Sequence, residues 1–168
     1  MKVTNWNQIC RVGLLAGLVL SITMSVATAQ EVATAQEKND GEKSGKLEGT
    51  WSEQVTVRVC GSGAQLFTFP SLATFNSGGT MMDTTAGASL SLRSPGHGKW
   101  EKTGKGTYHA TVLALLFSPA GTWSGTQRLS IGIVVTGDES SFTTTSETFD
   151  TGGILELTAC ATGVGHRL

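Results

Sequence analysis

Charged side chains are scarce in this sequence: Asp, Glu, Lys and Arg together make up 15% of its 168 residues. The 12 basic residues are scattered along the chain, and the formal net charge is −1. Proteins that bind nucleic acids or anionic membranes concentrate basic residues in a patch or stripe. The charge pattern therefore argues against both kinds of partner, and we expect no nucleic-acid binding.

The sequence also lacks the patterns of common metal sites. Its three histidines, His97, His109 and His166, are far apart, without His-x-His or His-x₃-His spacing and without a nearby cysteine. We expect His97 in a turn, His109 in solvent and His166 in a disordered terminus. No metal site and no cofactor are predicted.

Patterns of covalent catalysis and phosphate binding are missing as well. No G-x-S-x-G nucleophile elbow occurs, and neither Gly78-Gly79 nor Gly152-Gly153 precedes a helical segment that would bind phosphate. We therefore assign no catalytic residue.

The first 29 residues have the features of a secretory signal peptide. Lys2 and Arg11 provide positive charge, an uncharged and mostly apolar run follows, and Ala27-Thr28-Ala29 matches the small-x-small pattern of a cleavage site. A transmembrane anchor is the alternative, although the run of about 18 residues is at the short limit for a span. We predict cleavage after Ala29 and a periplasmic or secreted protein.

The predicted mature chain has a flexible polar linker over residues 30–46 and one domain over residues 47–168, with no membrane span. Removing residues 1–29 takes away two of the 12 basic residues and no acidic one, so ten basic and 13 acidic residues remain and the formal charge is −3. Cys10 is also removed. Cys60 and Cys160 remain, an even number in a compartment that permits disulfides.

Long helical periodicity is absent from the predicted domain. Short alternating apolar runs separated by Gly-rich segments take its place, a pattern typical of an all-β barrel or sandwich. Most connections are short enough for hairpins, and only residues 86–97 form a long loop. The expected strands are Thr50–Cys60, Leu66–Asn76, Thr80–Thr85, Gly98–Lys102, Thr107–Phe117, Gly125–Thr136, Ser141–Phe149 and Ile154–Thr162.

Consecutive hairpins of this kind form a meander, and eight strands close into a barrel that is wide enough for one small ligand. Closure also removes exposed strand edges. We therefore predict an all-β, eight-stranded antiparallel up-and-down barrel. A two-sheet sandwich is the alternative, but it needs longer crossing connections. Residues 112–117 are apolar on both faces, so we expect the long loop or a partner to cover their outer face.

The two remaining cysteines test barrel closure. Closure pairs the first strand with the eighth, and alternation places Cys60 and Cys160 on the outward face of these two strands. Residues on one face of adjacent strands approach within disulfide range if the register places them opposite. We predict a Cys60–Cys160 disulfide; two free thiols are the alternative.

Gly49-Thr50-Trp51, at the start of the first strand, resembles the G-x-W motif of the lipocalin and calycin superfamily. The resemblance implies an eight-stranded meander around an apolar pocket. It also implies that a basic residue near the end of the last strand packs over Trp51 and seals one barrel end, and Arg167 matches that position. The chain further resembles a group of uncharacterised exported bacterial proteins through L-x-G-T-W (47–51), R-S-P-G-H-G-x-W (93–100) and G-T-Q-R (125–128).

Inward-facing aromatic and polar residues are the candidates for a ligand pocket. Glu53 is the one candidate carboxylate; it either lies in the apolar interior with a raised pKa, or sits hydrated at the open rim, or pairs with Gln127 or Arg128. The full candidate set is Glu53, Phe67, Phe69, Phe75, Trp100, Tyr108 and Gln127.

The sequence thus predicts a non-enzymatic, lipocalin-like barrel that binds a small apolar or amphipathic molecule. Two alternatives remain open. One is a small barrel enzyme of the cyclase or isomerase type that uses Glu53. The other is a barrel with a filled interior that binds proteins through its loops, as barrel-type inhibitors do.

Overall fold

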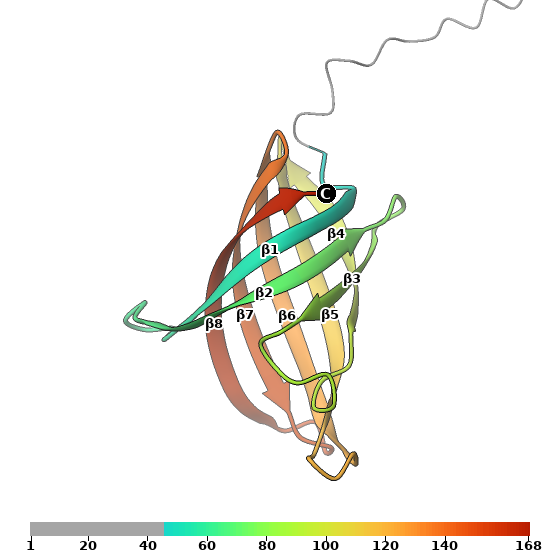
Figure 1. Cartoon of the computed structure of the whole chain (residues 1–168), viewed down its shortest axis with the longest axis vertical. Helices are drawn as coiled ribbons and strands as arrows, with labels where there is room; N and C mark the ends of the chain where they lie inside the picture. Colours follow the sequence, from blue (N-terminus) through green and yellow to red (C-terminus); the bar gives the residue numbers. More distant parts are fainter. Residues whose placement is uncertain (1–45) are drawn as a thin grey trace, which may run out of the picture. The chain divides into compact units, whose positions relative to one another are not determined.

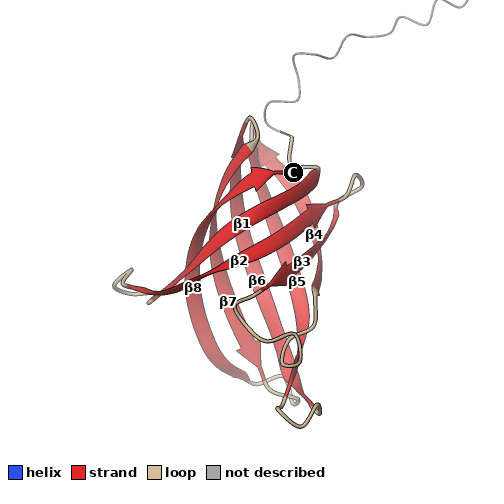
Figure 2. Ribbon diagram, in the orientation of Figure 1, coloured by secondary structure: helices blue, strands red, loops and turns tan. Residues whose placement is uncertain are grey.

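The computed structural model describes residues 46–168, which form one closed barrel of antiparallel strands. Each strand pairs with the next in sequence, and β8 pairs with β1 to complete the ring (Figure 1). The described residues contain no helix (Figure 2). The predicted eight-stranded up-and-down barrel is confirmed. The strands are β1 (Gly49–Arg58), β2 (Gln65–Phe75), β3 (Thr80–Thr85), β4 (Gly96–Gly104), β5 (Thr107–Phe117), β6 (Trp123–Thr136), β7 (Glu139–Phe149) and β8 (Leu155–Arg167).

The predicted signal peptide and all of the predicted linker except Lys46 lie outside the described residues. Residues 46–168 contain no helix with the length and apolar character needed to span a bilayer.

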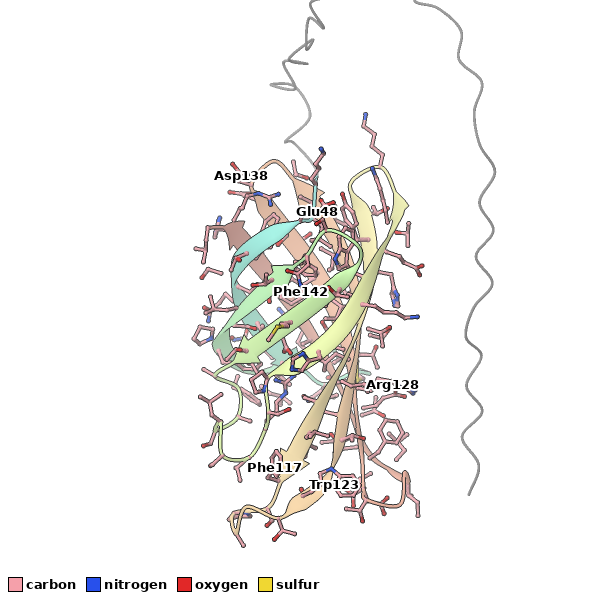
Figure 3. All side chains as sticks on the ribbon, turned by 90° about the vertical axis from the view of Figure 1, so that its right-hand side faces the viewer. Glu48, Phe117, Trp123, Arg128, Asp138 and Phe142 are labelled. Carbon is pink, nitrogen blue, oxygen red and sulfur yellow. A yellow bond between two sulfur atoms is a disulfide. The ribbon has the colours of Figure 1, made fainter. Side chains whose placement is uncertain are left out.

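One end of the barrel is filled by a core around Trp51. The Trp51 side chain is fully buried, and its Nε1 donates a hydrogen bond to the Leu47 carbonyl at 2.9 Å. The buried cluster at this end consists of Leu47, Trp51, Ala73, Phe75, Met81, Tyr108, Ala110, Val112, Ile133, Val135 and Phe142. Figure 3 shows Phe142, from β7, within the barrel. This end of the barrel is therefore closed by packed side chains.

Arg167 covers the closed end. Its guanidinium carbon lies 4.4 Å from the centre of a Trp51 ring, the position that the lipocalin resemblance implies. The same guanidinium donates hydrogen bonds to the carbonyls of Lys46 and Glu48, and its Nε donates to Asp138 Oδ1 at 2.9 Å. Arg167 thus joins β8, the residues that precede β1, and the turn between β6 and β7.

A disulfide joins β8 to the end of β1. Val57 pairs with Ala161 and Arg58 with Cys160, and Cys60 follows two residues after Arg58. The Cys60–Cys160 bridge has a Cα–Cα distance of 5.0 Å and closes a separation of 100 residues. The predicted disulfide at the barrel seam is confirmed.

Several strands extend further than the sequence predicts, and the extensions of β4 and β8 contain inward glycines. β8 continues to Arg167 and β4 begins at Gly96, so His166 and His97 lie in strands. The predictions of a disordered His166 and of a turn at His97 are therefore wrong. A Cβ on Gly163 would lie 2.1 Å from Phe142 Cζ, so a bulky neighbour fills the space of the missing side chain. The apolar alternation that marks a strand is consequently absent there.

The outer face of β5 carries exposed apolar side chains. Leu113 is 55% exposed and Leu115 is 48% exposed. Residues 92–94 of the long loop pair with the end of β5 through backbone hydrogen bonds, but they leave these two side chains exposed. The long loop therefore does not cover this face, and cover by a partner stays a prediction.

Candidate functional site

The half of the barrel opposite Trp51 contains a cavity with a volume of about 530 Å³. Most of its wall is apolar and comes from β1, β2, β6 and β8, with residues of the long loop on one side. Strand β7 contributes mainly hydroxyls, from Thr144, Ser146 and Thr148. Four of the apolar lining residues, Val59, Leu66, Phe67 and Leu157, are 43–59% exposed. Because residues that line the cavity also face solvent, the cavity opens to the outside at this end.

A buried ion pair lies in the wall of the cavity. Arg93 Nη2 lies 2.9 Å from Asp83 Oδ2, and the two side chains are 5% and 10% exposed. Arg93 Nε donates a hydrogen bond to Gln127 Oε1 at 2.6 Å, and Gln127 Nε2 donates to Ser146 Oγ at 2.9 Å. Arg93 Nη1 donates to the Ser94 carbonyl at 3.1 Å. Each nitrogen of the guanidinium is therefore engaged within the protein, as buried charges require.

The long loop places Arg93 in this position. Arg93 forms a β-bridge with Leu116, and hydrogen bonds on either side, from Phe117 N to Leu92 O and from Ser94 N to Leu115 O, hold the loop against β5. The loop thus continues the pairing that β4 makes with β5. Its backbone also packs on Phe69, because a Cβ on Gly87 would lie 2.6 Å from that ring.

Glycine at position 96 makes room for Asp83. Asp83 on β3 pairs directly with Gly96 on β4. A Cβ on Gly96 would lie 1.8 Å from Asp83 Oδ1 and 2.5 Å from Val112 Cγ1, far inside contact distance. The carboxylate of Asp83 therefore occupies the volume that any other residue at position 96 would need.

Glu53 is the second carboxylate of the cavity. Burial, and secondly the negative charge of Asp83, raise the pKa of Glu53 to about 7, although a hydrogen bond with Ser71 acts in the opposite direction. No salt bridge within residues 46–168 includes Glu53. A carboxyl with a pKa near neutrality can bind a proton, donate it, or carry a charge under physiological conditions.

The alternatives that paired Glu53 with Gln127 or Arg128 are wrong. Gln127 bonds Arg93 and Ser146, whereas Arg128 lies on the outer face and pairs with Glu147 at 2.6 Å. Figure 3 shows Arg128 on the outer side of the sheet.

The structure divides the predicted pocket residues into two groups. Five of them line the cavity: Glu53, Phe67, Phe69, Phe75 and Gln127. The other two lie outside the cavity lining, at the closed end. The Trp100 ring packs edge-on against Phe75 and against Tyr108, with ring centres 6.4 and 5.6 Å apart. Trp100 and Tyr108 are therefore placed as core residues.

Asp83 and Arg93 line the cavity but were not among the residues predicted from the sequence. Asp83 lies in a short strand, and Arg93 lies in a segment that has no strand periodicity of its own. Arg93 begins the R-S-P-G-H-G-x-W motif, which was the available signal. The motif does not indicate that the loop pairs with β5 and places the Arg93 side chain in the cavity wall.

The histidines do not gather at the cavity. His97 and His166 are exposed, and His109 Nε2 lies 3.1 Å from Ser130 Oγ on the neighbouring strand. In residues 46–168, no group of three or more His, Cys, Asp or Glu side chains is arranged to hold a metal ion.

Fold and site together define a closed eight-stranded β-barrel with an apolar cavity that is open at one end and polar in its interior. No protein-family model matches the chain, and no curated protein matches it. Among solved structures, the chain is similar to Rv2717c from M. tuberculosis, with 15% sequence identity, 73% of this chain and 92% of that chain covered, and a TM-score of 0.36.

Proposed function

We propose that this chain is an exported barrel protein that binds one small apolar or amphipathic molecule in its cavity. The observation that carries the proposal is the open cavity of about 530 Å³ with apolar walls. Its volume is within the range of about 300–1,000 Å³ that is typical of small-molecule sites. Apolar side chains at the opening, such as Leu66 and Phe67, remain 59% and 51% exposed, and a bound ligand would remove part of this surface from water.

The lipocalin resemblance and the disulfide support the same proposal. Arg167 over Trp51 closes one barrel end and leaves the other end for ligand access. The Cys60–Cys160 bridge is compatible with the oxidising compartment that an exported protein reaches.

The cavity also bears on the two alternatives. A barrel that acts only through its loops has no need of an open interior, so the cavity favours a small-molecule function. The pKa of about 7 at Glu53 keeps a barrel enzyme as the second candidate, because a general acid or base works best when its pKa is near the ambient pH.

Native mass spectrometry of the protein purified from its host tests the binding function. We expect a co-purifying apolar molecule, and uptake of the neutral fluorescent probe N-phenyl-1-naphthylamine after that molecule is removed. Ala161→Phe adds a ring inside the cavity and is expected to abolish uptake, whereas Val164→Phe adds the same ring on the outer face of β8 and leaves uptake intact. A ligand-free mass together with no probe uptake by the wild-type protein would contradict the proposal.

The enzyme alternative has a separate measurement. If Glu53 converts the bound molecule, Glu53→Gln will retain the molecule but leave it chemically unchanged, and the wild-type protein will release a product. If both proteins retain the same unchanged molecule, the binding function alone is supported.

A further inference from the structure

Of the charged side chains around the cavity, some are paired with an opposite charge and one carboxyl is not. Four charged side chains line it: Glu53, Arg58, Asp83 and Arg93. The Arg93 guanidinium is fully engaged by Asp83, Gln127 and the Ser94 carbonyl, so its charge is balanced by Asp83. Once this pair is formed, the carboxyl of Glu53 has no cation against it within the described residues.

Arg58 does not supply the missing positive charge. It follows Glu53 by five residues on β1, a separation of about 16 Å along an extended strand. Its Nε donates to Thr162 Oγ1 at 2.9 Å and its Nη1 to the Gly63 carbonyl at 3.1 Å, which directs it toward the β1–β2 turn. The elements beside Glu53 present the hydroxyl of Ser71 from β2, the carboxylate of Asp83 from β3, and Gly165 from β8.

This arrangement discriminates between polar groups on an apolar ligand. Where Glu53 is ionised, a carboxylate that reached it would meet the negative charges of Glu53 and Asp83 and a guanidinium whose nitrogens are already used, so it would be repelled. An ammonium group would instead form a charge-assisted hydrogen bond with Glu53, and such bonds are strong where water is excluded. A hydroxyl would form a weaker, uncharged bond.

We propose, building on the small-molecule function above, that the cavity binds apolar molecules that carry a basic nitrogen, with the nitrogen on Glu53 and the apolar part toward the open end. The raised pKa of Glu53 agrees with this assignment, because a carboxyl without a cation retains its proton until a cation binds. Binding of an ammonium group then displaces that proton, and affinity rises as the pH rises through about 7.

Three ligands with the same ten-carbon chain test the assignment: decylamine, decanol and decanoate, each displacing N-phenyl-1-naphthylamine at pH 8. We expect decylamine to displace the probe at concentrations at least about tenfold lower than decanoate, since a hydrogen bond to a charged group contributes that much or more. The preference is expected to shrink at pH 5.5, where Glu53 is protonated. Glu53→Gln should lose the preference, and Glu156→Gln, on an exposed position of β8, should retain it.

The outcomes separate this inference from the function on which it rests. If the probe binds and decanoate displaces it as well as decylamine does, or if the preference survives in Glu53→Gln, the amine assignment is wrong and the binding function stands. If the probe does not bind to the wild-type protein at all, both are wrong. Probe binding by Glu53→Gln serves as the check that this variant is folded.

Discussion

Two carboxylates in the barrel interior, Glu53 and Asp83, have opposite electrostatic surroundings. Both carboxylate oxygens of Asp83 accept hydrogen bonds from Arg93 Nη2, at 3.3 Å for Oδ1 and 2.9 Å for Oδ2. The negative charge of Asp83 is therefore balanced by the guanidinium of Arg93. Glu53 has the hydroxyl of Ser71 and the nearby charge of Asp83, and its pKa is raised to about 7. At the scale of single residues, Arg93 and Asp83 neutralise each other, whereas Glu53 forms no salt bridge within residues 46–168.

The raised pKa makes Glu53 a source of pH-dependent stability. Its pKa is about 4.5 when exposed and about 7 in the folded chain, so the folded state binds the proton more tightly. The stabilising contribution is complete below pH 4.5 and is lost as the pH rises through 7. Glu53→Gln avoids this loss, and we expect the variant to gain about 2–3 kcal/mol over the wild type between pH 4.5 and pH 8.

Urea unfolding of both proteins at the two pH values measures this difference. Glu156→Gln is the matched control, because Glu156 is exposed on β8 and its variant should follow the wild type at both pH values. A constant difference between Glu53→Gln and the wild type would show that Glu53 titrates normally.

At the scale of strands, the closure of the barrel depends on the seam between β1 and β8. The two strands pair from Trp51–Arg167 to Arg58–Cys160, and the disulfide secures the seam where β1 ends. Beyond this point, Val59 and Leu66 are exposed around the opening of the cavity. The covalent bond thus lies beside the opening of the cavity, which both cysteines line.

Removal of the disulfide should therefore be costly. In the chain-entropy model, a bridge across 100 residues contributes up to about 4–5 kcal/mol, because it restricts the unfolded chain. We expect Cys60→Ala/Cys160→Ala to lower the free energy of unfolding by about 2–4 kcal/mol in chemical denaturation. The wild type in dithiothreitol should shift likewise, and the double variant should be insensitive to the reductant. Equal stability of the oxidised and reduced wild type would contradict the prediction.

At the scale of the whole molecule, the two ends of the barrel differ in the solvent exposure of their apolar side chains. The end around Trp51 is packed and covered by Arg167, and the other end leaves apolar side chains exposed around the cavity. Side-chain packing is thus concentrated at one end and the opening of the cavity at the other. A ligand-binding site at the less packed end is consistent with the general observation that binding regions come from the less stable parts of a fold.

A comparison of two arginines tests this division. Arg167 and Arg128 each form an ion pair and lie over an aromatic ring, but their side chains are 20% and 49% exposed. We expect Arg167→Ala to cost about 2–3 kcal/mol, because it removes the cation over Trp51 and leaves the carbonyls of Lys46 and Glu48 without their donor. Arg128→Ala should cost less than about 1 kcal/mol, as is usual for exposed pairs. Similar losses of thermal stability in both variants would argue against a special role for the closed end.

The sequence by itself determined the strand order, the closed barrel and the Cys60–Cys160 bridge. These follow from alternation and short turns, which are local properties, and from the even number of cysteines at the two strands that closure joins. It also placed Glu53 and Gln127 among the inward residues. Strand limits at Gly96 and Arg167 were missed because inward glycines carry no apolar side chain to reveal the alternation.

Only the tertiary structure decided how the interior is divided between core and cavity. Trp100 and Tyr108 fill the closed end, although alternation along their strands is the same as that of cavity residues. Arg93 reaches the interior because its loop pairs with β5, and Asp83 meets it because Gly96 leaves space. These contacts join residues from different strands and a loop, so their distances depend on the barrel's curvature and not on any local pattern in the chain.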